Sequence, residues 1–187
     1  MIFLGVSAAF LVENYRQKEN DKAEMMQAVA GIIKELEHYE TKSVTFADRF
    51  QSAIDRWSAA DKAGKRAAPG YFRIPGAPHP PSAAWNATVT SGIARMLDPQ
   101  LRIDLGYFYN EFVGIHDSYD RYNQFTEREI LPRISQGPDA FYGADGKVLP
   151  IFRVHMDLQA EFAANLRRLA KDSHDLRLRL EALSASQ

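Results

Sequence analysis

The chain has 187 residues and a net charge of −1, from 23 basic and 24 acidic side chains. This length suits one domain with a real hydrophobic core, and the balanced charge gives no general attraction to nucleic acid. The chain has no cysteine, which excludes disulfides, thiolate metal sites and a cysteine nucleophile. We therefore expect no nucleic-acid partner, and no motif predicts a cofactor.

The first twelve residues carry no charge, whereas residues 13–24 carry seven charged side chains. A charged group at the centre of a bilayer costs roughly 2.5–3.5 kcal/mol, so this break predicts a membrane anchor over residues 1–15. The residues predicted to contact lipid are Ile2, Phe3, Leu4, Val6, Phe10, Leu11 and Val12.

This apolar segment is short for an anchor. A helix of that length rises only about 18 Å, against a hydrocarbon core of about 30 Å. We interpret it as the C-terminal half of a single-pass anchor whose upstream part is missing, as a start codon placed too late would produce. Three alternatives remain: a signal peptide with Val6-Ser7-Ala8 as its cleavage site, a short apolar end at the membrane interface, and a buried core helix.

Apolar residues recur at helical rather than strand spacing. The first helix is predicted to run from the apolar start to about Ala60. A loop rich in proline and glycine follows over residues 64–81. Its apolar members Tyr71, Phe72 and Ile74 are expected to pack back onto the bundle. The core stripe of the first helix consists of Met25, Val29, Ile32, Leu36, Tyr39, Ser43, Phe46, Phe50, Ile54 and Trp57.

Three more helices are predicted after this loop. Ser82 is expected to cap a short helix that carries Trp85, Val89 and Ile93 on one face. Asp98 and Pro99 then begin a long helix, with Asp as the cap and Pro at the first helical position. The core heptad of this helix is Leu101, Leu105, Phe108, Phe112, Ile115, Tyr119 and Tyr122.

A second loop is predicted over residues 137–150, and the last helix over residues 151–185. The predicted fold is all-α: a long anchor and stalk helix continues into an antiparallel bundle of three long helices plus one short helix, over residues 16–187. The core seam of the last helix is predicted as Leu158, Phe162, Leu166, Leu169, Leu176, Leu180 and Leu183.

Glu35 and His38 have the Glu-x-x-His spacing that ferritin-like di-metal sites use, which places both side chains on one helix face. Such a site needs a second pair, and the sequence contains no other Glu-x-x-His. The favoured interpretation of Glu35 and His38 is a solvated pair beside Leu36, with a metal site as the alternative.

Two other histidines stand next to carboxylates. His116 with Asp117, and His155 with Asp157, resemble pairs that support a metal or a general base. Neither pair accompanies a serine nucleophile or an oxyanion loop at recognisable spacing. We therefore expect these histidines to be exposed, or singly hydrogen-bonded, on helix surfaces.

The third helix is rich in aromatic side chains, most of which follow its core stripe. Tyr107 and Tyr109 lie about 100° to either side of Phe108, at the edges of that stripe. Together with Arg121 they are candidates to line a ligand pocket or a partner surface. The alternative is ordinary packing of phenol groups at a core edge.

The N-terminal junction over residues 3–16, FLGVSAAFLVENYR, resembles the end of the anchor in a group of uncharacterised bacterial proteins. These proteins have one N-terminal transmembrane helix and a helical extracytoplasmic domain. The chain departs from their pattern in its short apolar segment and in Tyr15, where tryptophan is more usual. Further matching positions are Ala84-Trp85, Ser91-Gly92, Leu97-Asp98-Pro99, Leu101, Leu105 and Tyr107. The resemblance implies a single-pass protein of the bacterial inner membrane and transfers no catalytic residue.

Two functional hypotheses follow. The favoured one is a membrane-anchored helical domain that is not an enzyme and binds a partner protein, or a second copy of itself, as a scaffold. The alternative is a ligand-sensing or metal-binding bundle that uses the aromatic third helix or Glu35 and His38. Membrane lipid is the expected partner of the N-terminal helix. Mixed charges after the anchor leave the orientation to the resemblance, which implies a periplasmic bundle.

Overall fold

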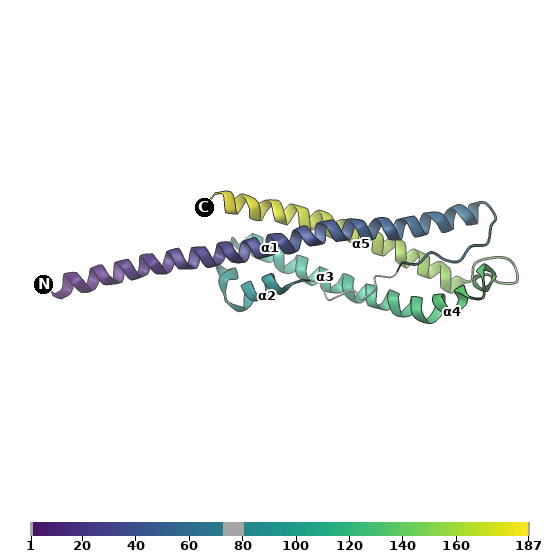
Figure 1. Ribbon diagram of the computed structural model, residues 1–187, viewed down its shortest axis with the longest axis horizontal. Coiled ribbons are helices and arrows are strands. Elements are labelled where there is room, and N and C mark those ends of the chain that lie inside the picture. Colours follow the sequence, from purple (N-terminus) through teal and green to yellow (C-terminus); the bar gives the residue numbers. More distant parts are fainter. Residues whose placement is uncertain (1, 73–80, 187) are drawn as a thin grey trace.

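The computed structural model describes residues 2–72 and 81–186, with side chains from Glu13 onward in these ranges (Figure 1). Its architecture is all-α, which confirms the predicted fold class. The elements are α1 (Ile2–Lys62), α2 (Ala83–Thr90), the 3-10 turn η1 (Ile93–Met96), α3 (Pro99–Phe125), the π-helical turn η2 (Thr126–Ile130), α4 (Leu131–Ile134), the 3-10 turn η3 (Pro138–Phe141) and α5 (Pro150–Ala185).

Three long helices lie side by side, and α5 runs antiparallel to both α1 and α3 (Figure 1). The contact between α1 and α5 is the most extensive in the molecule. α1 and α3 point in the same direction, since α1 ends at one end of the bundle and α2 begins far from that end (Figure 1). The predicted antiparallel bundle of three long helices is therefore not confirmed, because α1 and α3 are parallel and only α5 runs the opposite way. Hydrophobic spacing along a helix specifies its buried face but not its direction relative to another helix.

α1 ends where glycine allows a left-handed turn. Gly64 has φ +66°, and its N–H donates to the carbonyl of Asp61 at 2.9 Å. The N–H of Lys65 donates to the carbonyl of Ala60 at 2.9 Å, which completes a Schellman motif. The helix therefore ends at Lys62, close to the predicted end.

The predicted stripe forms the core face of α1. Val29, Ile32 and Leu36 are almost fully buried, and the polar member Ser43 is buried with them. Small residues are also buried on both α1 and α5. These small residues are Ala47 and Ala53 on α1 and Ala163, Ala170 and Ser173 on α5.

The N-terminal part of α1 projects beyond the bundle (Figure 1). Residues 13–20 are exposed, and Met25 is the first buried residue among the side chains described. In the described part of the chain, no helix is long and apolar enough to cross a membrane. The predicted anchor residues Ile2, Phe3, Leu4, Val6, Phe10, Leu11 and Val12 lie outside the described side chains, so the anchor stays a prediction.

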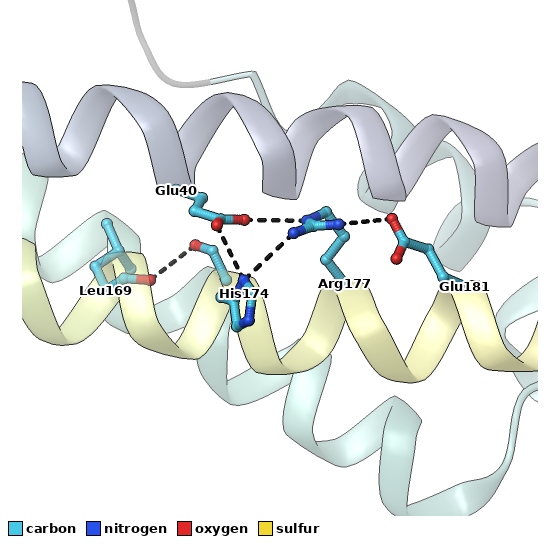
Figure 2. Close-up of polar contacts among 6 residues, drawn as sticks. Glu40, Leu169, His174, Arg177 and Glu181 are labelled. Carbon is cyan, nitrogen blue, oxygen red and sulfur yellow. Dashed lines mark hydrogen bonds and ion pairs between the residues drawn. The ribbon is translucent and has the colours of Figure 1, made fainter.

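A polar network fixes the register of α5 on α1. Figure 2 shows the carboxylate of Glu40 on α1 between two α5 side chains, accepting a hydrogen bond from Arg177 Nε at 3.0 Å and lying 2.9 Å from His174 Nδ1. Arg177 also donates to Glu181 at 2.7 Å. Burial raises the pKa of Glu40, but the hydrogen bonds from Arg177 and His174 outweigh it and leave that pKa below its ordinary value. Every member of this network has a partner, so we interpret it as a structural clamp.

α3 begins as predicted. The Asp98 side chain accepts hydrogen bonds from the N–H groups of Gln100 and Leu101, both at 3.0 Å, and Pro99 occupies the first turn. The helical path continues beyond Phe125 through η2 and α4, although Pro132 lacks an N–H. A proline ring clashes with the carbonyl four residues before it, and a π-helical turn over residues 126–130 is one way to relieve that clash.

A second, smaller hydrophobic core lies at the end of the bundle where α1 ends and α5 begins. Ile130, Phe141, Val148 and Phe152 form this cluster. The Tyr142 hydroxyl donates to the carbonyl of Ala67 and lies 3.0 Å from the Ala67 nitrogen, which ties the segment before α5 to the segment after α1.

The segment after α1 packs back onto the bundle in part. Phe72 contacts the rings of Phe46 and Phe50, as predicted. Tyr71 is exposed, contrary to the prediction, and Ile74 lies outside the described residues.

Candidate functional site

Glu35 is buried rather than solvated, with 8% of its surface exposed. Its Oε1 accepts a hydrogen bond from the N–H of Ala84 at 2.7 Å. Its Oε2 accepts one from the Tyr109 hydroxyl at 2.7 Å and a longer one from the N–H of Trp85 at 3.4 Å. The expectation of a solvated pair is therefore wrong for Glu35.

This carboxylate caps α2 from another helix. The first N–H groups of a helix lack partners inside the helix and favour a negative charge, and Glu35 supplies it from α1. Ser82 occupies the predicted cap position but makes no side-chain hydrogen bond to the α2 backbone. Gly31 permits the close approach, because a Cβ there would lie 3.0 Å from the Ala84 Cβ. The Tyr39 hydroxyl also donates to the carbonyl of Pro81.

The surroundings of Glu35 are aromatic. Trp85 stacks on Tyr109 with ring centroids 5.5 Å apart and planes at 3°. Burial, followed by the neighbouring Glu35 carboxylate, raises the pKa of both Tyr39 and Tyr109, so both phenols stay neutral. We call Glu35, Tyr39, Trp85 and Tyr109 the Glu35 cluster.

The Glu35 cluster does not include the other residues predicted for this region. His38 is exposed, and the described residues hold no group of three His, Asp or Glu side chains that could bind a metal. Val89, predicted to share the inner face of α2 with Trp85, is exposed, and Thr88 is buried instead.

The candidate ligand residues of the third helix point to different places. Tyr109 is buried in the Glu35 cluster, whereas Tyr107 is 72% exposed. Arg121 is exposed and donates to the Ser118 hydroxyl at 3.0 Å. Of the three, only Arg121 lines the concave site described below.

That site is an open groove between the C-terminal half of α3 and the N-terminal half of α5, with a volume of about 640 Å³. We call it the α3–α5 groove. Three of its α5 residues are large, apolar and about half exposed: Ile151 (47%), Val154 (57%) and Leu158 (53%). Leu158 was predicted to lie in the core seam, and this is wrong. Phe125 of α3 and Phe162 of α5 complete the apolar lining.

His155 also lines the α3–α5 groove, although only 2% of its surface is exposed. Its ring stacks on Tyr122, with centroids 5.0 Å apart and planes at 7°, and on Phe125, with centroids 4.9 Å apart. The expectation of a surface histidine is wrong here. Burial lowers the pKa of His155 to about 4, so the imidazole is neutral at pH 7.

The Nε2 atom of His155 is buried and has no hydrogen-bond partner among the described residues. One turn further along α5, Gln159 is fully buried, and its Nε2 donates to the Tyr122 hydroxyl at 2.8 Å. The N–H of Phe72 donates to the same hydroxyl at 2.9 Å. These two hydrogen bonds hold Tyr122 in place, and the stacked ring of His155 is positioned by Tyr122 in turn.

Charged side chains border the groove. Arg121 and Arg128 stand on the α3 side and Glu161 on the α5 side. Nε of Arg128 also lies 3.3 Å from Glu129. The site thus combines an apolar wall, neutral hydrogen-bonding side chains such as His155, Gln124 and Asn165, and two guanidinium groups against one carboxylate, a lining that suits ligand binding.

No protein-family model, curated protein or solved structure matches the chain. The resemblance to single-pass bacterial proteins therefore stays a prediction.

Proposed function

We propose that this protein is a membrane-tethered helical binding domain, not an enzyme, which holds the α3–α5 groove away from the bilayer. The observation that carries the proposal is the groove itself. Ile151, Val154 and Leu158 are exposed together on one α5 face, beside a buried histidine whose Nε2 has no partner in the described chain. Exposed apolar residues that cluster in a concave site are typical of binding surfaces.

The shape of α1 supports the tether. Arg167 of α5, two residues beyond the groove, pairs with Asp48 of α1 at 3.2 Å. At 1.5 Å per residue, Asp48 lies about 50 Å along α1 from Glu13, where the charged part of the sequence begins. An anchor in the bacterial inner membrane would therefore place the groove well outside the headgroup region, on the periplasmic side that the resemblance implies.

Photocrosslinking in living cells tests whether the groove is occupied. A benzophenone amino acid at Leu158 should form a recurrent adduct, detected as added mass on the purified protein. The matched control is Leu178, which is 47% exposed on the same helix but does not line the groove. Val154→Glu should abolish the adduct at position 158.

The adduct's mass separates the two hypotheses drawn from the sequence. A protein-sized adduct supports a partner or a second copy of the chain, and a small adduct supports ligand binding. The same adducts at positions 158 and 178, or none at either, would contradict a binding function for the groove.

The tether has its own test. Protease added to intact spheroplasts should cleave the segment at residues 64–72 if the bundle lies on the periplasmic side of the membrane. If the bundle lies in the cytoplasm, the protease cannot reach this segment and should leave it intact. Release of the full-length protein by a carbonate wash would contradict an integral anchor.

A further inference from the structure

We propose that the α3–α5 groove binds a small amphipathic organic anion, with its apolar body against α5, its acid group on Arg121 and a hydroxyl or carbonyl group on His155. This inference rests on the proposed function, because it names the occupant of the same groove.

The size and lining of the groove favour a small molecule. Its volume of about 640 Å³ lies within the range of small-ligand sites, which are mostly apolar with a few fixed polar groups. Val154, Leu158 and Phe162 supply the apolar wall, and Phe125 adds an aromatic ring to the lining.

His155 identifies a polar group on the ligand. Buried polar atoms in folded proteins are nearly always hydrogen-bonded, and a group without a partner needs an explanation. The imidazole is stacked on Tyr122 and Phe125, so its orientation is fixed before any ligand arrives. A neutral imidazole nitrogen exchanges a hydrogen bond with a hydroxyl or carbonyl group, and a ligand that offers one would complete it.

Arg121 identifies the charge. Its described partner is the uncharged Ser118 hydroxyl, whereas Arg128 already lies against Glu129. The guanidinium of Arg121 is therefore the better placed of the two to receive a carboxylate, which it can bind through two parallel hydrogen bonds. Glu161, on the opposite wall, would disfavour a second negative charge near it.

Three related probes isolate each contact. The first, 6-hydroxy-2-naphthoate, carries an apolar ring system, a carboxylate and a hydroxyl. The second, 2-naphthoate, lacks the hydroxyl, and 2-naphthol lacks the carboxylate. Binding of each to the full chain is measured by calorimetry or equilibrium dialysis, and we expect 6-hydroxy-2-naphthoate to bind most tightly.

Variants then assign the contacts. Arg121→Gln should weaken the binding of both naphthoates by about tenfold and leave the binding of 2-naphthol unchanged. Arg102→Gln, elsewhere on α3, should change the binding of none of the three probes. His155→Phe keeps an aromatic ring in place and should weaken 6-hydroxy-2-naphthoate by about fivefold, while 2-naphthoate binds as before. Unchanged binding of 2-naphthoate also shows that this variant is folded.

Three outcomes would overturn the inference. They are no binding of any probe at millimolar concentration, equal losses in Arg121→Gln and Arg102→Gln, and a His155→Phe variant that weakens both naphthoates alike. A protein adduct at Leu158 in cells would also overturn it while supporting the proposed function. The absence of both adducts and probe binding would overturn the two together.

Discussion

The two ends of the bundle differ in whether their buried polar atoms have hydrogen-bond partners. In the Glu35 cluster, one carboxylate receives hydrogen bonds from α2 and from α3. At the other end, near the α3–α5 groove, the structure leaves buried side-chain atoms unpartnered among the described residues. These atoms are Trp57 Nε1, Asn123 Oδ1, His155 Nε2 and Gln159 Oε1.

This contrast separates two uses of a buried polar side chain. A buried carboxylate that accepts hydrogen bonds from donors on other elements joins those elements and has its hydrogen bonds supplied by the fold. The buried imidazole nitrogen of His155, which has no partner among the described residues, makes no such connection between elements. Both residues were candidates in the sequence for metal or acid–base chemistry, and only their surroundings distinguish a structural joint from a binding group.

The largest expected effect comes from removing the Glu35 carboxylate, which connects α1 to α2 and α3. Glu35→Ala leaves the N–H of Ala84, the N–H of Trp85 and the Tyr109 hydroxyl without their acceptor, and should lower the free energy of unfolding by about 4 kcal/mol. Urea denaturation measures it, with Glu37→Ala, an exposed neighbour, as the control. A loss below about 1 kcal/mol would mean that packing of Trp85, not the carboxylate, holds α2.

The next largest effect is the pH dependence of stability that the buried His155 should cause. The folded pKa of His155, about 4, lies below the ordinary value of 6.5, so the unfolded chain binds a proton more readily. Stability should be complete above about pH 7 and should fall as the pH drops toward 4, by about 3 kcal/mol from this residue. Urea midpoints at pH 7.5 and pH 4 should therefore differ more for wild type than for His155→Phe. Equal differences would contradict a buried neutral imidazole.

The fold class and the core face of α1 could be predicted because they depend on spacing along one helix. The role of Glu35 could not, since its donors Ala84 and Tyr109 lie 49 and 74 residues away in the sequence. Nothing in the Glu-x-x-His spacing shows that a second helix will begin against that carboxylate.

The groove was missed for a different reason. The predicted α5 seam followed hydrophobicity and placed Leu158 inside, whereas spacing alone would have placed Gln159 there. One series of nine buried α5 positions alternates gaps of three and four without a break and includes polar residues, while Met156, Ala163 and Ala170 are buried beside it. The nine positions are Phe152, His155, Gln159, Phe162, Leu166, Leu169, Ser173, Leu176 and Leu180. The sequence places a histidine and a glutamine, His155 and Gln159, on this buried series. That placement could have predicted buried polar side chains next to a binding site.

A smaller effect separates two tyrosines that the sequence grouped together. Tyr109→Phe removes one hydrogen bond to the Glu35 carboxylate, which keeps its two backbone donors, and should cost about 2 kcal/mol of unfolding free energy. Tyr107→Phe, at an exposed position on the same helix, should change it by less than about 0.5 kcal/mol. Equal losses in the two variants would show that Tyr109 acts through packing alone.

The smallest effect is the most informative about the groove. Leu158 is 53% exposed, so Leu158→Lys should change the free energy of unfolding by less than about 0.5 kcal/mol. Leu166→Ala, two turns along the same helix and buried, should cost about 3 kcal/mol. A large apolar residue that the fold does not need, beside a histidine whose Nε2 has no partner in the described chain, is expected of a binding surface and not of a core. If Leu158→Lys destabilises as much as Leu166→Ala, the wall of the groove belongs to the core, and both ends of the bundle serve stability alone.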